Sequence, residues 1–282
     1  MGRSSGPGRE ASGAGAGSSL TPERVNVRLA VEYDGTAFVG LQFQRELRSV
    51  QSVLETALSR IFEEPIKLAA AGRTDAGVHA SGQVVSFTTA RSSFPFERLS
   101  LALNSALPND VSVRDAAVVD PEFSVRFSAV ERSYVYAIFN RRSPSALLAT
   151  TAYHVYAPLD LDAFGDGAAH LIGKHDFRSF CGTPPDNDNT VRTVKTLTVR
   201  RHGDLVRIGI TADGFVHRMV RTIVGTLIEC ATGRRDPSAI PAILGARMRS
   251  AAGLTAPARG LYLAGVLYRD GYDSYSEPPL FS

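Results

Sequence analysis

Apolar positions along the chain follow two periods, which together predict alternating strands and helices. The stretch VNVRLAVEY (25–33) is apolar at every second position, which is typical of a strand with one buried face. After Ser49, apolar residues recur at helical spacing up to Ile61, so we expect Ser49 to cap a helix. This order of elements predicts an α+β or mixed-sheet fold. Further strands are predicted at 66–71, 83–88, 110–119, 133–140, 193–201, 205–212 and 261–268, and further helices at 95–107, 161–172, 215–230 and 237–247.

The alternation of strands and helices starts again near residue 126, which divides the folded chain into two similar halves. We place the N-terminal half at 25–125 and the C-terminal half at 126–270, although the halves share no strict sequence repeat. A C-terminal tail covers 271–282. The N-terminal tail, 1–24, is rich in Gly, Ser and Ala. We expect it to be disordered, because it has too little apolar surface to offset its ordering entropy.

Composition excludes several classes of protein. The 282 residues are 44% apolar and 21% charged, which is ordinary for a globular chain with a sizeable core. No run of about eighteen apolar residues is present, so we expect no membrane span. Cys181 and Cys230 are too few for a disulfide framework, and a reducing cytoplasm is the simplest compartment.

Positive charge is concentrated in one window of an otherwise near-neutral chain. The formal net charge is only +3, but between Arg192 and Arg221 seven Lys and Arg stand against two Asp. Such a window is typical of a phosphate-binding surface. The same charge pattern fits a solvated pair of strands with arginines on the outer face equally well.

The loop GRTDAG (72–77) carries the residues that most suggest chemistry. It has the glycine spacing of a phosphate-binding loop, but Val78 and His79 stand where Lys and Ser or Thr are required. Nucleotide hydrolysis is therefore excluded. The other histidines are scattered, and none is paired with His79 at ligand spacing, so we expect no metal site.

Asp75 in this loop has two interpretations. In the first, Asp75 forms an Asx-turn in which Gly77 takes a positive φ. In the second, strands on both sides hold the loop, and Arg73 keeps the Asp75 carboxylate ionised and oriented. Such a carboxylate, with no metal and no second carboxylate, suggests a nucleophile that forms a covalent intermediate. These residues by themselves do not name the reaction.

Several ordered segments resemble the TruA-type tRNA pseudouridine synthases. GRTDAGVHASGQVVSF resembles the family's catalytic signature, and VEYDGTAFVGLQFQ and RSVQSVLETALSRI resemble its first strand, turn and helix. FSVRFSAVERSYVYAIFN resembles its central stretch. DGFVHRMVRTIVGTLIE and GLYLAGV resemble its C-terminal motifs. The resemblance runs from Val25 to about Tyr268.

The resemblance implies a pseudouridine synthase fold, in which two α+β halves with antiparallel-rich mixed sheets flank a basic central cleft. It implies isomerisation of uridine to pseudouridine at positions 38 to 40 of the tRNA anticodon stem-loop, without metal, ATP or organic cofactor. One C–N bond is broken and one C–C bond is formed, so the detached uracil must be held while it rotates. The partners implied are tRNA and a second copy of the chain in a homodimer.

The same resemblance assigns four catalytic residues. Asp75 is the implied nucleophile, attacking C6 of the base or C1′ of the sugar, or acting through an elimination route. Arg73 would pair with Asp75 and help to displace the target base from its stack. Tyr134 would stack on the flipped uracil or transfer a proton; by pattern alone it fits a strand aromatic equally well. Arg221 would reach toward Asp75 from its helix.

Further residues are expected to bind the substrate. Leu261 and Tyr262 would wall the uracil pocket, and core packing explains them equally well. His217 and Arg218 would lie on an RNA-facing surface. Phosphate contacts, which position RNA without reading its sequence, are expected from basic residues of the two strands. These are Arg192, Arg200, Arg201 and Arg207.

The chain departs from the family in one turn. It reads Gly40-Leu41-Gln42 where an aromatic, often Trp, is usual in the middle, and it has no Trp at all. The departure concerns the packing of that turn and not the chemistry. Two other functions stay open here: an RNA-binding module without catalysis, which would tolerate loss of Asp75, and a pseudouridine synthase that acts on other RNA sites.

Overall fold

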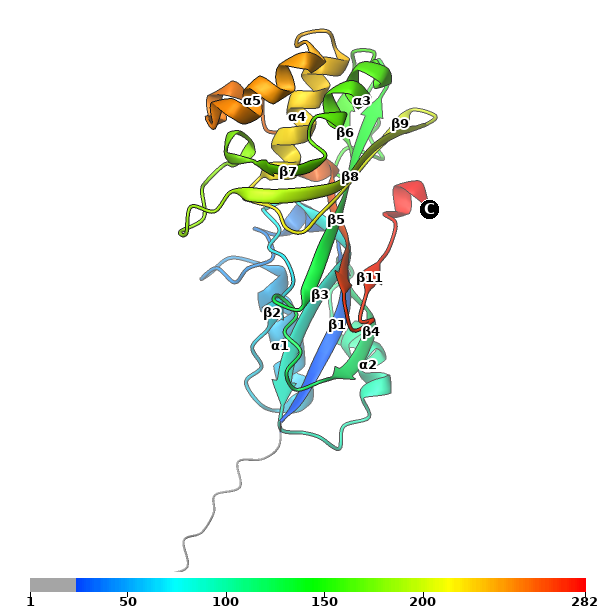
Figure 1. Cartoon of the computed structure of the whole chain (residues 1–282). Helices are drawn as coiled ribbons and strands as arrows, with labels where there is room; N and C mark the ends of the chain where they lie inside the picture. Colours follow the sequence, from blue (N-terminus) through cyan, green and yellow to red (C-terminus); the bar gives the residue numbers. More distant parts are fainter. Residues whose placement is uncertain (1–23) are drawn as a thin grey trace, which may run out of the picture.

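The computed structural model describes residues 24–282, and its strands form one mixed sheet of eleven strands (Figure 1). Eight strands follow the order β4-β1-β3-β10-β5-β9-β8-β7, while β2, β6 and β11 pair with β3, β5 and β10. Among these strands, only β10–β3 and β5–β6 are parallel, so the predicted α+β fold with an antiparallel-rich mixed sheet is confirmed. The elements are β1 (Val25–Tyr33), α1 (Val50–Phe62), β2 (Ala69–Ala70), β3 (His79–Thr89), α2 (Leu99–Ala106), β4 (Val111–Val119), β5 (Ala129–Asn140), β6 (Tyr153–Val155), α3 (Leu161–Ala169), β7 (Gly173–Asp176), β8 (Val191–His202), β9 (Leu205–Ala212), α4 (Met219–Ala231), α5 (Ile240–Ala246), β10 (Leu261–Tyr268) and β11 (Ser274–Tyr275).

Strand β10 joins the two parts of the sheet. It runs parallel to β3, with Tyr262 opposite His79, and antiparallel to β5, with Leu261 opposite Tyr136. Because β10 is the last long strand of the chain, backbone hydrogen bonds close the end of the fold against its beginning. The loop before β3 and the elements after β5 are thereby brought to one place.

Both predicted halves contribute strands to one sheet, so the sheet itself marks no boundary between them. The predicted domain boundaries therefore stay predictions. The predicted C-terminal tail, 271–282, contains β11, which pairs with β10. The predicted disordered tail, 1–24, lies outside the described residues except for its last residue. No helix within 24–282 combines the length and the apolar character needed to cross a membrane.

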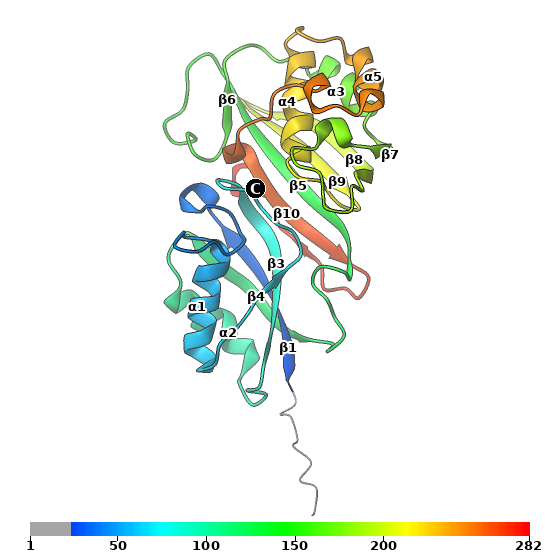
Figure 2. The same ribbon diagram turned by 90° about the vertical axis from the view of Figure 1, so that its left-hand side faces the viewer.

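One face of the sheet carries the main hydrophobic core. Leu29 of β1 and Val85 of β3 are register partners, and they belong to the same buried cluster as Leu54 of α1. In the other half, Tyr136 of β5 packs in this cluster with Ile223 of α4. Figure 2 shows α1 and α2 beside the β1–β3–β4 part of the sheet and α3, α4 and α5 beside the β9–β8–β7 part. The helices thus cover a continuous core that spans both halves.

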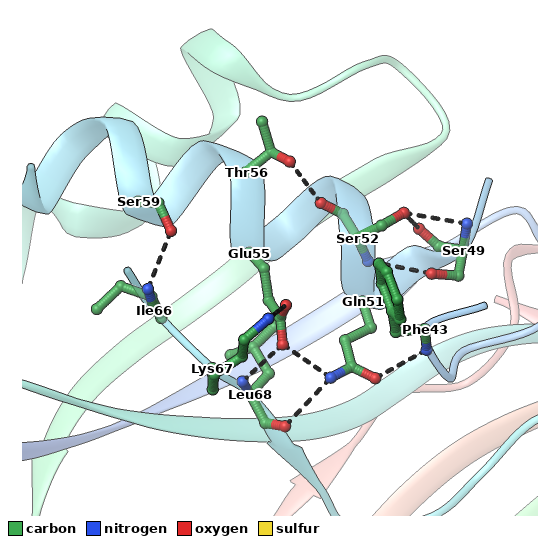
Figure 3. A network of polar contacts seen from close by, with 10 residues as sticks. All are labelled: Phe43, Ser49, Gln51, Ser52, Glu55, Thr56, Ser59, Ile66, Lys67 and Leu68. Atoms are coloured by element: carbon green, nitrogen blue, oxygen red, sulfur yellow. Dashed lines mark hydrogen bonds and ion pairs between the residues drawn. The ribbon is translucent and has the colours of Figure 1, made fainter. Parts of the chain in front are cut away.

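Helix α1 begins after Ser49, as predicted, and fixes the segment that leads to the GRTDAG loop (Figure 3). Ser49 and Ser52 form reciprocal side-chain to backbone hydrogen bonds of 3.1 and 3.2 Å, which satisfy amides at the helix start. The buried Glu55 accepts from the Leu68 amide at 3.0 Å and pairs with Lys67 at 3.0 Å. The helix is therefore tied directly to the residues before β2.

The helix predicted at 215–230 starts later than its apolar pattern suggested. Arg218, at its N-cap, has a φ of 61°, a left-handed conformation that a helix cannot continue through, and α4 begins at Met219. Phe215 therefore precedes the helix, in a segment that borders the cleft described below. The short strands β6, β7 and β11 were not predicted, since two to four residues give no periodic signal.

Candidate active site

Asp75 lies in a tight turn between β2 and β3. The Val78 amide donates to the Asp75 carbonyl at 3.1 Å, and Gly77 has a φ of 75°, which is the positive φ expected from the sequence. The Asx-turn interpretation is wrong, however. The Gly77 amide donates to the Phe38 carbonyl at 3.3 Å and not to the Asp75 carboxylate. The turn is made by backbone groups, and the Asp75 carboxylate contacts Arg221 instead.

The turn at Gly40 holds the Asp75 loop in place. Gly40 forms an isolated β-bridge with Asp75, and the Leu41 amide donates to the Thr74 carbonyl at 3.1 Å. Gly40 has a φ of 114°, and a Cβ there would lie 2.6 Å from the Thr74 carbonyl oxygen, so the position requires glycine. Leu41 is 3% exposed and packs in the main core. The departure from the family's usual aromatic thus leaves a well-packed turn.

Arg221 of α4 is the ion-pair partner of Asp75. Its Nη1 donates to Oδ2 of Asp75 at 2.8 Å, while its Nε donates to the Ala256 carbonyl at 2.8 Å. The Ala256 amide donates in turn to the Arg221 carbonyl at 3.0 Å. These bonds fix the guanidinium in one orientation, and the side chains are only 15% (Arg221) and 30% (Asp75) exposed. The structure places Arg221 against Asp75, where the sequence expected it to reach.

His217 approaches the other oxygen of the same carboxylate. Its Nδ1 accepts from the Thr183 amide at 3.1 Å, which assigns the hydrogen of a neutral ring to Nε2. Nε2 lies 3.6 Å from Oδ1 of Asp75. The Gly182 amide donates to the His217 carbonyl at 2.8 Å, so the 182–183 loop holds both the backbone and the ring. The sequence placed His217 only on an RNA-facing surface; the structure places it beside the carboxylate as well.

The expected pair between Arg73 and Asp75 is absent. Arg73 is exposed, lines the cleft, and has no ion pair or side-chain hydrogen bond with any residue in 24–282. The expectation assumed an extended segment, in which residues two apart share a side. The bridge to Gly40 and the turn that starts at Asp75 change that geometry, so that the carboxylate meets α4 instead.

Asp75 lies in a cleft of about 1130 Å³ that both halves of the chain line. Six arginines and three aspartates contribute to its walls, so the cleft is basic, as the fold prediction had it. A concave wall with excess positive charge concentrates the field that attracts a polyanion. The arginines are Arg73, Arg126, Arg132, Arg192, Arg218 and Arg221, and the aspartates are Asp75, Asp186 and Asp213.

Tyr134 of β5 forms part of the cleft wall and is 9% exposed. Its ring packs edge-on against Phe215, with the ring centroids 5.0 Å apart. Burial raises the pKa of the Tyr134 phenol well above its usual range, and the negative charge of Asp75 adds to this effect. The phenol is therefore neutral at physiological pH. It offers an aromatic surface and a hydrogen-bond donor, and it does not supply a phenolate base.

Leu261 and Tyr262 lie on opposite faces of β10, which corrects the expectation that both wall the pocket. Leu261 lines the cleft. Tyr262 is buried on the other side of the strand, where its ring stacks on His79 at 4.7 Å and its hydroxyl donates to the Thr151 carbonyl at 2.7 Å. Successive residues of a strand alternate in direction, so the sequence itself held the signal that only one of the two faces the pocket.

The five arginines expected on RNA-facing surfaces do not form one continuous surface. Arg207 of β9 does not line the cleft: its Nη2 donates to Glu277 Oε2 at 2.9 Å, which corrects the expectation that its guanidinium is free for a phosphate. Arg192 and Arg218 line the cleft, at the start of β8 and just before α4. Arg200 and Arg201 are exposed near the other end of β8, roughly 26 Å along the strand from Arg192. Arg201 donates there to Asn140 Oδ1 at 3.0 Å. The basic window of the sequence is thus split because its strand is long and runs away from the cleft.

Arg132 is a site residue that the sequence did not single out, although it lies in the segment that resembles the family. Its guanidinium donates to four main-chain carbonyls: Ala71 at 3.2 Å, Arg126 at 2.8 Å, Ala129 at 3.1 Å and Asp213 at 3.2 Å. It joins the loop before Asp75, the turn before β5 and the segment before α4. An arginine next to the apolar run of a strand was the available signal that this half-buried side chain has a structural role.

His79 fastens the other end of the GRTDAG loop. Its Nε2 lies 3.0 Å from the Thr150 carbonyl and 3.1 Å from the Arg259 carbonyl, while its Nδ1 accepts from the Gly35 amide at 3.1 Å. The ring is therefore neutral, with its hydrogen on Nε2, although Asp34 Oδ1 lies 3.1 Å from Nδ1. Burial holds the pKa of His79 below its usual value. Within 24–282 no group of three or more His, Cys, Asp or Glu is arranged to bind a metal.

We expect His79→Gln to lower the free energy of unfolding by about 2 kcal/mol at pH 7.5, because buried hydrogen bonds and a ring stack are lost. The wild-type imidazole is neutral when folded and takes a proton when unfolded below about pH 6.5. Its contribution is therefore complete above that pH and falls as the pH decreases. Between pH 7.5 and 5.5 the difference between wild type and variant is expected to narrow by about 1 kcal/mol. Urea unfolding at both pH values checks this; a constant or widening difference would contradict a neutral His79.

Comparison with known proteins identifies the family. The family model described as tRNA pseudouridine synthase matches residues 29–128 and 168–269. The tRNA pseudouridine synthase A of Moorella thermoacetica is 45% identical over 244 residues, which cover 86% of this chain and 99% of that protein. The protein of the same name from Escherichia coli O1:K1 / APEC is 43% identical over 263 residues, with 92% and 97% covered.

Among solved structures, a chain of a Cbf5-Nop10-Gar1 complex matches with a TM-score of 0.33 and 11% identity, over 76% of this chain and 54% of that one. This similarity is too low to support a statement about fold or function. The sequence matches are decisive, because they cover most of the chain, and the family model spans the Asp75 loop and Arg221. The chain therefore belongs to the TruA-type tRNA pseudouridine synthase family, a family of isomerases.

Proposed function

We propose that this chain isomerises uridine to pseudouridine at positions 38 to 40 of the tRNA anticodon stem-loop. The observation that carries the proposal is the Asp75 carboxylate, held by Arg221 at 2.8 Å inside a basic cleft. In the reaction the C1′–N1 bond of the nucleotide breaks and a C1′–C5 bond forms. The hydrogen on C5 leaves as a proton and N1 gains one, so the reaction has no net redox change.

Asp75 is the proposed nucleophile. It attacks C6 of the uracil or C1′ of the ribose, or it assists elimination at the sugar. Arg221 and His217 approach different oxygens of the carboxylate, at 2.8 and 3.6 Å, which limits its rotation. A fixed nucleophile lowers the entropic cost of reaching the transition state.

The target uridine has to leave the base stack to reach this carboxylate. Asp75 is 30% exposed and lies within the cleft wall, so a base still paired in a stem is out of reach. We infer that Tyr134 and Leu261, which both line the cleft, contact the extruded uracil. Arg73, exposed on the same cleft and without an ion pair among the described residues, is the side chain proposed to occupy the space that the base leaves.

The tRNA backbone is proposed to lie along the basic wall of the cleft. The proposed phosphate contacts are Arg192 and Arg218, which both line the cleft. Arg200 and Arg201 contact RNA only if it extends beyond the cleft to the far end of β8. The homodimer and the cytoplasmic location implied by the resemblance stay predictions.

A test of the proposal measures tritium release from tRNA transcripts labelled at uridine C5. We expect the full-length protein to release tritium from transcripts with uridine at position 38, 39 or 40. A transcript in which all three are cytidine, and which keeps its other uridines, serves as the control and should release none. Release from the control transcript would support a synthase with other RNA sites. Binding of every transcript without release would support the non-catalytic module.

A further inference from the structure

An exposed aromatic side chain, Phe127, stands at the cleft that contains Asp75. It is 83% exposed, and it belongs to no hydrophobic cluster of the described residues. Among the aromatic residues that line the cleft, Tyr134 and Phe215 are buried or half-buried and pack on each other. Phe127 is the one that faces solvent, which leaves a large apolar surface without a partner inside the chain.

The turn that carries Phe127 is firmly held. The Ser128 amide donates to the Ser124 carbonyl at 2.9 Å, and the Ser124 amide donates to the Ser128 hydroxyl at 3.1 Å. Between them, the Val125 side chain is buried and its carbonyl accepts from the Tyr268 hydroxyl at 2.8 Å. The exposed position of the Phe127 ring is therefore imposed by a structured backbone.

Arg132 links this turn to the catalytic loop. Its Nη2 donates both to the Arg126 carbonyl at 2.8 Å and to the Ala71 carbonyl at 3.2 Å. The same guanidinium thus fixes Phe127's neighbour and the segment that leads to Asp75. A ligand that contacts Phe127 is thereby held at a fixed position relative to the Asp75 carboxylate.

The charges around Phe127 indicate what covers it. The Arg126 guanidinium lies 5.5 Å from the ring centroid, and Arg73, Arg192 and Arg218 line the same cleft. Cations beside an exposed aromatic face suit a nucleobase attached to a phosphate backbone, which stacks on the ring while its phosphates meet the arginines. An apolar protein surface would bury several arginines without partners, which is unfavourable.

We propose that Phe127 is a stacking platform for a nucleobase next to the uridine that Asp75 attacks. This inference rests on the proposed function for the identity of the RNA. Extrusion of the target base breaks its stacking with its neighbours, and a fixed aromatic ring at the cleft replaces one of those lost contacts. Phe127 is thus a positioning residue, distinct from Tyr134 inside the cleft, and it holds the RNA while the extruded base reacts.

The test uses the full-length protein and an anticodon stem-loop RNA with 2-aminopurine beside the target uridine. Wild type should quench the 2-aminopurine fluorescence through stacking. Phe127→Ala should lose the quenching and raise Kd about 5- to 150-fold, the effect of removing one base–aromatic stack. Phe127→Tyr should restore both, since it keeps the ring. Tyr156→Ala, which removes an aromatic that is 76% exposed away from this cleft, is the matched control and should bind like wild type.

Three results overturn the proposal. The first is a Phe127→Ala variant that binds and quenches like wild type. The second is a Phe127→Tyr variant as defective as Phe127→Ala. The third is a change in oligomeric mass, by sedimentation, with unchanged RNA affinity, which would assign Phe127 to a contact with a second copy of the chain. Failure of the proposed function has a different readout, because wild type would then release no tritium from labelled tRNA. The binding and quenching data would still decide the role of Phe127.

Discussion

Replacing Asp75 with Asn is expected to lower kcat/KM for tritium release from tRNA by about 10⁴-fold or more, the scale observed when an essential nucleophile is removed. Asn has nearly the same shape, but its amide is a far weaker nucleophile than a carboxylate. The affinity for tRNA should stay the same or increase, because the cleft loses a negative charge. Single-turnover release from C5-labelled tRNA, with Kd measured in parallel, separates the two effects.

Asp186→Asn is the matched control for this prediction. Asp186 also lines the cleft, but it is exposed and has no side-chain hydrogen bond or ion pair among residues 24–282. Its amide variant removes the same charge from the same cleft and should leave the rate unchanged. If Asp75→Asn released tritium at the wild-type rate, or if both variants were equally slow, Asp75 would not be the nucleophile.

Arg221→Lys is expected to lower kcat by about 10²-fold, the effect of displacing a reacting group by roughly 1 Å. The guanidinium donates to Asp75 and to the Ala256 carbonyl from two separate nitrogens, each at 2.8 Å. A lysine ammonium is a single point charge without this planar fork, so it cannot hold both partners in the same geometry. KM should change little, because the net charge of the cleft is preserved. Steady-state and single-turnover kinetics show whether the substitution changes kcat, KM or both.

Arg235→Lys provides the control, because Arg235 follows α4 and forms an ion pair with a residue of that helix. Arg235 pairs with Glu229 of α4 at 2.9 Å, with side chains 25% and 20% exposed, and neither residue lines the cleft. The Arg235→Lys variant disturbs an ion pair of similar exposure and should keep full activity. A kcat of Arg221→Lys equal to that of wild type would mean that the orientation of Asp75 does not depend on the guanidinium.

Local elements were predictable because each depends on residues close together in the sequence. The strand at 25–33 and the helix capped by Ser49 follow from alternation and capping alone, and the structure has both. The positive φ at Gly77 was also predicted, although from an Asx-turn that the structure does not contain. The start of α4 was misplaced, because the left-handed conformation of Arg218 depends on its surroundings and leaves no mark in the apolar pattern.

The arrangement of side chains around Asp75 was much less predictable. By spacing alone the sequence offered Arg73, two residues away, as the partner of the carboxylate, and it was the family resemblance that implied an approach of Arg221. The structure uses Arg221, 146 positions further along the chain. Similarly, Arg192 and Arg200 looked like one basic surface, but the length of β8 separates them. Contacts between distant segments depend on how the strands are ordered in the sheet, and a single sequence does not specify that order.

The α+β class, most of the helices and strands, and a turn at Asp75 could be predicted from the sequence, because propensity, periodicity and capping are local properties. Its family motifs also identified the type of isomerase. The pairing of β10 with both β3 and β5 depends on the tertiary structure, as does the approach of His217, which precedes α4, to the Asp75 carboxylate that Arg221 holds. The tertiary structure also lets Arg132 join the turn of Phe127 to Ala71, just before the GRTDAG loop. Those positions are set by burying one continuous core over a single sheet, which couples residues that the sequence keeps far apart.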